Sequence, residues 1–142
     1  MIYLGQILTW RFPAAPDDGF SVQVAADGTY YLAVWREAAM GRPRPKQTEI
    51  DSWVLPANKY YQRRAIKRLA DMDYDAIFAI NGEIMNMYKD RLIIKIARGQ
   101  ALTTAEAANR DQMLAIIQSV QDKVQAINAA TTVAQVEGVT WP

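Results

Sequence analysis

Histidine and cysteine are both absent from this chain of 142 residues. Without them, Ser–His–Asp triads, Cys–His pairs and the usual zinc sites cannot form. The absence of cysteine also excludes a disulfide framework and thiolate chemistry. We therefore expect a protein that is not an enzyme and that carries no cofactor and no catalytic or metal-binding residue; a small enzyme that uses only carboxylates or Lys and Tyr stays a minor alternative.

The chain also lacks a large excess of positive or negative charge and long runs of apolar residues. The formal net charge is +1, which gives no general attraction to nucleic acid or to a membrane surface. Apolar runs such as Leu92-Ile93-Ile94 stop far short of the roughly 20 residues that a membrane-spanning helix needs. The first residues, Met-Ile-Tyr-Leu-Gly, do not resemble a signal peptide. We expect a soluble protein made in a cytoplasm.

The N-terminal part of the chain has the composition and alternation of β-strands. Residues 2–10 have strand composition, and residues 20–25 alternate between apolar and polar side chains. Asp27-Gly28 is a strong hairpin signal, and residues 29–35 follow as a second strand rich in Tyr, Val and Trp. Because an isolated hairpin is marginal in water, residues 2–10, another copy or a partner should add a third strand.

A Pro-rich junction separates this head from a helical part. Pro43 and Pro45 restrict their own φ angles and those of the residues before them, which predicts a stiff elbow. Thr48 is the expected N-cap of a short helix that ends at about Val54, before Pro56. We expect Asn58 to cap the next helix, which reaches about Ala70.

Two long helices are predicted to follow, over residues 73–98 and from about residue 103 to about residue 129. Gly99 suits the end of the first, and Thr103 or Thr104 suits the start of the second. The short link between them predicts an antiparallel hairpin. Residues 131–138 resemble a capped single turn, and Trp141 should pack on the hairpin head or on a neighbour.

The predicted fold class is α+β, with a small N-terminal antiparallel β head followed by a C-terminal antiparallel helical hairpin. The expected parts are a β-hairpin head (1–40), a Pro-rich elbow with a short helix (41–56) and a helical hairpin stalk with a short C-terminal turn (57–142). The first long helix is apolar over more than one partner helix can cover, which predicts a homo-oligomer, a trimer or larger. The candidate interface residues are Tyr30, Trp35, Trp53, Ile77, Ile84, Met87, Ile117, Val124 and Trp141.

Two charged clusters invite a functional interpretation. Asp71-Met72-Asp73-Tyr74-Asp75 looks like the start of a calcium loop, but Ala76 and Gly82 stand where such a loop needs Gly and Glu. We interpret it as a helix boundary. Residues 63–68 form a basic helix face beside Tyr60 and Tyr61, which suits phosphate binding or a solvated, ion-paired face. The near-zero net charge favours the second, so no nucleic-acid partner is expected; a regulator that binds nucleic acid stays a minor alternative.

The layout resembles small tail-associated proteins of tailed bacteriophages. The residues that carry the resemblance are Val34-Trp35-Arg36, the Pro-rich link, Thr48-Glu49-Ile50-Asp51-Ser52-Trp53, the stretch Ile127 to Glu137, and Trp141-Pro142. The resemblance implies a structural component of a tail fibre or baseplate, located in the virion tail after synthesis in the host cytoplasm, with other phage tail proteins as partners. The alternative is a tail-fibre assembly chaperone that is absent from the mature virion.

Overall fold

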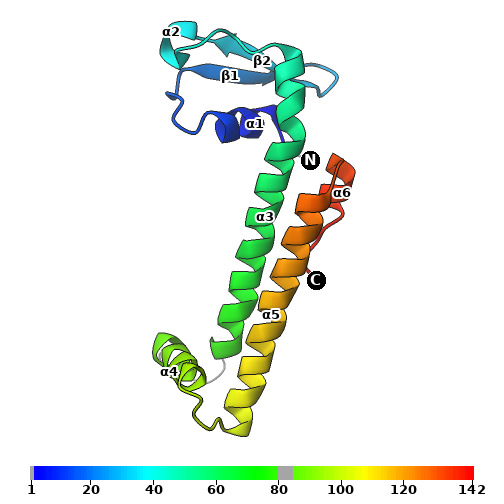
Figure 1. Cartoon of the computed structure of the whole chain (residues 1–142). Helices are drawn as coiled ribbons and strands as arrows, with labels where there is room; N and C mark the ends of the chain where they lie inside the picture. Colours follow the sequence, from blue (N-terminus) through cyan, green and yellow to red (C-terminus); the bar gives the residue numbers. More distant parts are fainter. Residues whose placement is uncertain (1, 80–84) are drawn as a thin grey trace. The chain divides into compact units, whose positions relative to one another are not determined.

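The computed structural model describes residues 2–79 and 85–142. The chain divides into two compact units: a head unit of residues 1–62 with 130–138, and a helical unit of residues 63–129 with 139–142. A small antiparallel sheet precedes a mostly helical chain, so the predicted α+β class is confirmed (Figure 1). The described elements are α1 (Leu4–Arg11), β1 (Phe20–Val24), β2 (Tyr30–Trp35), α2 (Glu37–Met40), α3 (Gln47–Ala79), α4 (Met85–Ala97), α5 (Thr104–Ala129) and α6 (Val133–Glu137).

The predicted hairpin is present in the head unit. β1 and β2 pair antiparallel, from Phe20 opposite Trp35 to Val24 opposite Tyr30, with an irregularity between Ser21 and Val22. Gly28 has a φ of +83°, and the backbone N–H of Thr29 donates to Asp27 Oδ1 at 2.9 Å. Hydrogen bonding to Thr29, first to its side chain and then to its backbone N–H, lowers the pKa of the Asp27 carboxyl. The Asp-Gly pair therefore makes the turn that its sequence predicts.

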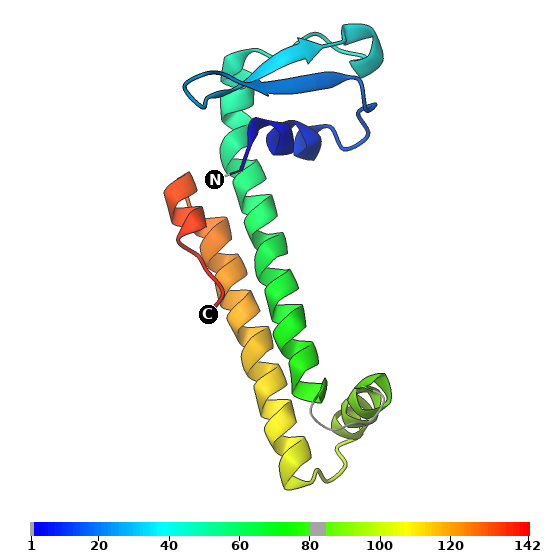
Figure 2. The ribbon, with the colours of Figure 1, turned by 180° about the vertical axis from the view of Figure 1, so that it is seen from behind.

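Residues 2–10 do not form the predicted third strand. Residues 4–11 form helix α1, which packs on both strands of the hairpin, as the view from behind also shows (Figure 2). Gln6 Oε1 accepts a hydrogen bond from the backbone N–H of Tyr3 at 2.9 Å, which satisfies one end of the helix. Leu8 and Leu32 are buried, so α1 covers the apolar face of the hairpin that a third strand was expected to complete.

The elbow is fastened by side chains as well as by its prolines. The indole N–H of Trp35 donates to the carbonyl of Arg42 at 3.0 Å, and Arg44 donates to the carbonyl of Leu32. The Arg42 guanidinium lies over the rings of Phe12 and Trp53, at 5.1 and 6.0 Å from their centres. The segment after β2 is thus tied to both the hairpin and the start of α3.

The helix that follows the elbow is longer than predicted. It begins at Gln47 rather than after a Thr48 cap, and the carboxylate of Glu49 accepts from the backbone N–H of Lys46 at 2.8 Å. It continues through Pro56 to Ala79, so the predicted ends at Val54 and Ala70 are wrong. Asn58 is no cap; it is buried inside the helix, and its amide donates to the carbonyl of Val54 at 2.8 Å.

Tertiary packing explains why this helix tolerates an internal proline. A proline inside a helix costs about 3 kcal/mol, because it removes a hydrogen bond and crowds the preceding turn. Ile50 and Ala57, on either side of Pro56, are both buried in the head unit. Burial of this apolar face offsets the local penalty, which no local sequence pattern reveals.

The predicted helix over residues 73–98 is also wrong. In a continuous helix, Phe78 and Tyr88 would stand about 15 Å apart along the axis. Their ring centres are 5.8 Å apart, and Lys89 Nζ lies 3.7 Å from Asp75 Oδ1. Helix α4 is therefore a separate helix that packs against the end of α3.

The antiparallel pair of the helical unit consists of α3 and α5. Arg63 donates to Asn128 Oδ1 at 2.6 Å, whereas Ile77 and Phe78 meet Met113 near the other end of the pair. The predicted caps are present. Gly99, with a φ of +62°, follows α4, and the N–H groups of Gly99 and Gln100 donate to the carbonyls of Ile96 and Lys95.

The C-terminal turn is confirmed, but Trp141 is placed differently from the prediction. The Thr132 side chain caps α6, accepting from the backbone N–H of Gln135. The indole N–H of Trp141 donates to Asp73 Oδ2 of α3 at 2.5 Å, within the helical unit. Trp141 therefore binds the long helix rather than the hairpin.

Candidate interaction surfaces

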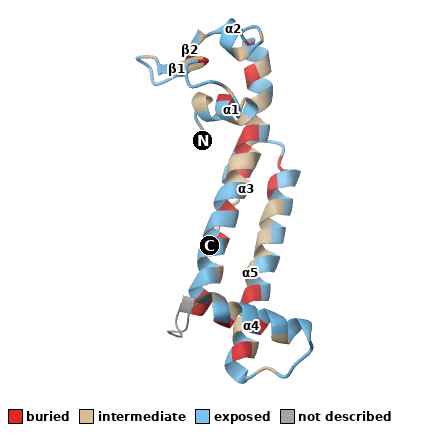
Figure 3. Cartoon of the chain, turned by 90° about the vertical axis from the view of Figure 1, so that its left-hand side faces the viewer, coloured by how far each residue is buried: buried red, intermediate tan, exposed pale blue. Residues whose placement is uncertain are grey.

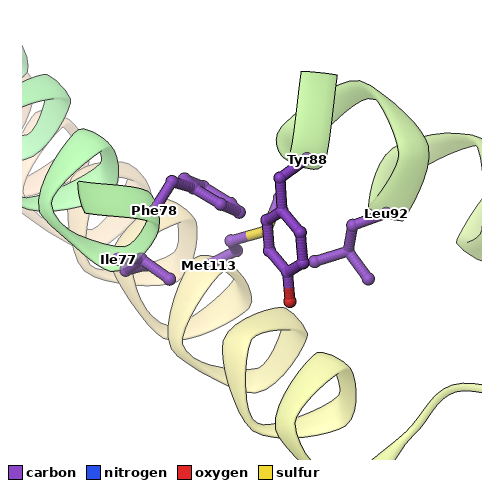
Figure 4. Close-up of a cluster of buried hydrophobic side chains, with 5 residues drawn as sticks. All are labelled: Ile77, Phe78, Tyr88, Leu92 and Met113. Carbon is purple, nitrogen blue, oxygen red and sulfur yellow. The ribbon is translucent and has the colours of Figure 1, made fainter. Parts of the chain in front are cut away.

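A compact core fixes α4 against α3 and α5 in the helical unit. Figure 4 shows Tyr88 and Leu92 of α4 pointing toward Phe78 of α3 and Met113 of α5. Asn109 donates to the hydroxyl of Tyr88 at 3.0 Å. This core orients α4, because its buried residues lie on one side of the helix and leave the other side uncovered by the described chain.

An ion pair fastens the C-terminal end of α4. Lys95 Nζ lies 2.6 Å from Glu106 Oε1, and the Glu106 carboxylate also accepts from the backbone N–H of Thr103. The hydrogen bond from Lys95, followed by the one from Thr103, lowers the pKa of the Glu106 carboxyl. Lys95 is thereby directed toward α5, and it is the only polar residue between Leu92 and Ala97.

The uncovered side of α4, with the neighbouring part of α5, forms the most apolar exposed surface that we find in the described chain. We name it the isoleucine face; most of α4 is coloured as exposed in Figure 3. Its members are exposed apolar side chains of the two helices: Met87, Ile93, Ile94, Ile96, Leu114 and Ile117. Met87 is 68% exposed and Leu114 is 56% exposed. The apolar residues of α4 therefore extend beyond those that its own core buries.

A groove runs through this face between α4 and α5. It has a volume of about 280 Å³, and Arg110 contributes the only charged side chain of its lining. Ile93, Ile96 and Ala97 line one wall, and Met113, Leu114 and Ile117 line the other. Exposed apolar residues gathered around a groove are typical of interaction sites. The geometry thus offers a hydrophobic groove to a partner.

The predicted interface residues divide among several environments. Met87 and Ile117 belong to the isoleucine face, and Val124 is half-buried on α5. Ile77 lies instead in the core of its own chain, where Phe78 and Met113 cover it, so the structure removes it from any exposed surface. Ile84 lies outside the described residues.

The predicted aromatic residues are also separated. Trp35 and Trp53 belong to the elbow, packed around Phe12, whereas Tyr30 is exposed in the head unit. Trp141 is held by Asp73.

Sequence reasoning missed Ile93, Ile96 and Leu114 as members of this surface. The apolar stretch after Arg91, interrupted only by Lys95, was the available signal. Which of these apolar side chains are exposed depends on where α4 begins. A single helix over residues 73–98 would have placed a different set of apolar residues on one face. The exposed side of α4 becomes clear only once Tyr88 and Leu92 are known to point inward.

The two charged clusters have structural partners. Asp73 binds Trp141, and Asp75 pairs with Lys89, whose Nζ lies 4.6 Å from the centre of the Tyr74 ring. Among the side chains that the structure describes, no group of three or more carboxylates is arranged to hold a metal ion. In the basic cluster, Arg63 is engaged by Asn128.

A larger pocket of about 580 Å³ also lies in the helical unit and shares Ile117 with the isoleucine groove. It combines Lys67, Asp71 and Asp75 with the apolar side chains of Ile116 and Val120. The mixed charges and the pairing of Lys89 with Asp75 give it no single ligand chemistry.

None of the helices within residues 2–79 and 85–142 combines the length and the apolar character needed to cross a membrane. Comparison with known proteins gave no match: no family model, no curated protein and no solved structure is similar to this chain.

Proposed function

We propose that this protein is a structural component of a bacteriophage tail, in the tail fibre or the baseplate. In this proposal the head unit docks on a neighbouring tail protein and the helical unit self-associates, as a trimer or a larger assembly. No catalytic step is part of the proposal. The observation that carries it is the isoleucine face, an exposed surface with the composition of a subunit interface.

The proposed self-association follows from the unfavourable free energy of exposing the isoleucine face to water. Each isoleucine or leucine side chain gains about 1.5–3 kcal/mol on full burial. Five such side chains are exposed on α4 and α5, and four of them, Ile93, Ile96, Leu114 and Ile117, line the groove between the helices. A bundle of copies buries these residues without any partner of special chemistry.

The tail assignment is supported by the sequence resemblance. Its segments lie at the end of β2, along the elbow and the start of α3, and at the end of the chain. The first two belong to the fastened elbow of the head unit, where Trp35, Trp53 and Arg42 interact. A fixed direction between a hairpin and a helix suits a protein that is built into a particle.

Mass spectrometry of purified virions tests the assignment, using the phage that encodes this sequence. We expect the chain at a fixed ratio to the major tail proteins. Its presence in infected cells and absence from virions would replace the proposal by the assembly-chaperone alternative. Light scattering on the purified protein tests self-association separately: we expect a trimer or larger at micromolar concentration, and a stable monomer would contradict that part.

A further inference from the structure

A groove lined by tyrosines lies in the head unit, apart from the isoleucine face. It has a volume of about 440 Å³ and is formed by the start of α1, the hairpin and α3. Three aromatic side chains, Tyr3, Tyr30 and Tyr61, contribute to its walls. The remaining lining residues are small, apolar or neutral polar: Gly5, Gln6, Thr9 and Val22.

The groove is preformed. The Tyr61 hydroxyl donates to the backbone carbonyl of Gln6 at 3.1 Å, which fixes the Tyr61 ring on α1. The ring centres of Tyr3 and Tyr30 are 4.9 Å apart and their planes are tilted by 53°. Tyr3 and Tyr30 are nevertheless 56% and 40% exposed, so their rings support each other and still present surface to a ligand.

Gly5 leaves space in the groove. Neither its backbone conformation nor crowding by neighbouring atoms explains why glycine stands at this position. It lies near the start of α1, and its φ is not positive. A Cβ added at this position would meet no atom within 4 Å. Glycine lowers helix stability by about 1 kcal/mol relative to alanine in a helix interior. The absence of a side chain at Gly5 therefore leaves space in the groove, which a larger residue would fill.

We propose that this groove binds an extended, proline-rich peptide segment of a neighbouring protein. The inference deepens the docking role proposed above for the head unit. Because no lining side chain carries a charge, the groove offers no counterion to phosphate, carboxylate or a basic segment. Its chemistry is that of aromatic surfaces with neutral hydrogen-bonding groups at the rim.

Proline-rich segments match this chemistry for two reasons. Their left-handed extended helix is rigid before binding, so little entropy is lost on an aromatic-lined surface. Proline lacks an N–H, and the carbonyls of such a helix make no internal hydrogen bonds. The ligand is therefore rich in acceptors, and the hydroxyls of Tyr3 and Tyr30, the Gln6 amide and the Thr9 hydroxyl can donate to it.

Binding of a fluorescent decaproline peptide to the purified full chain tests the proposal by polarisation. We expect saturable binding that Gly5→Leu weakens by about tenfold or more, because the leucine side chain fills the groove. Gly5→Ala should weaken binding less. Both variants should unfold at or above the temperature of the original protein, since both residues favour a helix more than glycine does.

A second pair of variants locates the site on the hairpin. Tyr30 and Tyr31 are adjacent on β2 and both exposed, so their side chains point to opposite faces. The Tyr31 hydroxyl donates to Gln23 at 2.9 Å and Tyr31 does not line the groove. Tyr30→Ala should weaken decaproline binding, whereas Tyr31→Ala should leave it unchanged.

Several results would overturn the inference. These are no decaproline binding at millimolar concentration, equal binding by Gly5→Leu, or binding of a neutral glucan oligosaccharide in place of the peptide. The assay is independent of the particle: decaproline binding by a chain that is absent from virions would reject the tail-component proposal and keep the peptide groove.

Discussion

The elbow of the head unit and the outer side of α4 both contain large apolar side chains, yet they differ in what covers them. At the elbow, Phe12, Trp35 and Trp53 pack edge to face, and the guanidinium groups of Arg11 and Arg42 lie over Phe12 and Trp53. On α4, the isoleucines that face away from Leu92 have no comparable cover from the described chain.

The comparison shows that a region rich in large apolar residues is not for that reason an interface. Aromatic residues are enriched in interfaces, which made the elbow tryptophans candidates. Their own chain covers them with arginine side chains, whose apolar and planar parts pack well on rings. The isoleucine face is the better candidate because folding leaves it exposed.

The largest predicted effect on stability is expected in the buried core that holds α4 against α3 and α5. Phe78→Ala removes the ring that lies between Tyr74 and Tyr88 in a side chain that is 2% exposed. We expect a loss of about 3–5 kcal/mol in the free energy of unfolding, measured by chemical denaturation. Ile94→Ala, on the exposed side of α4, should cost less than about 0.5 kcal/mol. Similar losses would show that α4 has no uncovered side.

The next prediction addresses assembly. Ile93→Glu places a charge at the wall of the isoleucine groove, where burial against another copy would strip it of water. The dissociation constant should rise by about a hundredfold or more, since each tenfold corresponds to about 1.4 kcal/mol. Sedimentation velocity measures the change. The matched control is Leu69→Glu, an exposed position of α3 outside this face, and an equal loss in both variants would contradict the assignment.

A smaller effect should follow from uncovering the elbow. Arg42→Met keeps much of the apolar side chain but removes the guanidinium from Phe12, Trp53 and Glu49. We expect a loss of about 1–2 kcal/mol and a red-shifted tryptophan emission. Arg36→Met breaks only an exposed pair with Asp18 and should cost about 0.5 kcal/mol or less. An unchanged emission in Arg42→Met would show that arginine does not shield the rings.

The smallest predicted effect depends on pH. The folded state lowers the pKa of Glu106, so its carboxylate contributes stability above the ordinary glutamate pKa of about 4.3. That contribution is lost as the pH falls through the lower, folded-state pKa. Thermal unfolding of Glu106→Gln and the original protein should therefore differ at pH 7 and converge in acid. A difference that grows in acid would mean that Lys95 and Thr103 do not stabilise the charged form.

Local patterns predicted the elements whose ends depend on a few neighbouring residues. The turn at Asp27-Gly28, the glycine end of α4 at Gly99 and the capped turn within residues 131–138 all appear as expected. Each depends on hydrogen bonds or a φ angle within about five residues. Helix α2 was missed, because its four residues carry no periodic pattern of their own.

Sequence patterns gave wrong predictions where contacts between distant residues determine the secondary structure. Residues 2–10 read as a strand, but α1 supplies the cover that the hairpin needs. Pro56 was expected to end a helix, yet the buried neighbours Ile50 and Ala57 keep α3 continuous. Of the candidate interface residues, Met87 and Ile117 are exposed, whereas Ile77 is buried in the core of its own chain. Helical spacing alone does not show which side of a helix its own chain covers.

Composition and interactions between near neighbours already fix several properties of this chain. It has no histidine or cysteine chemistry, a hairpin precedes long helices, and several helix ends are capped. Which apolar side of α4 stays exposed, and that Gly5 lines a tyrosine groove, became clear from the folded chain. Both depend on residues far apart in the sequence, such as Phe78 and Met113 or Gln6 and Tyr61, which packing within each unit brings together.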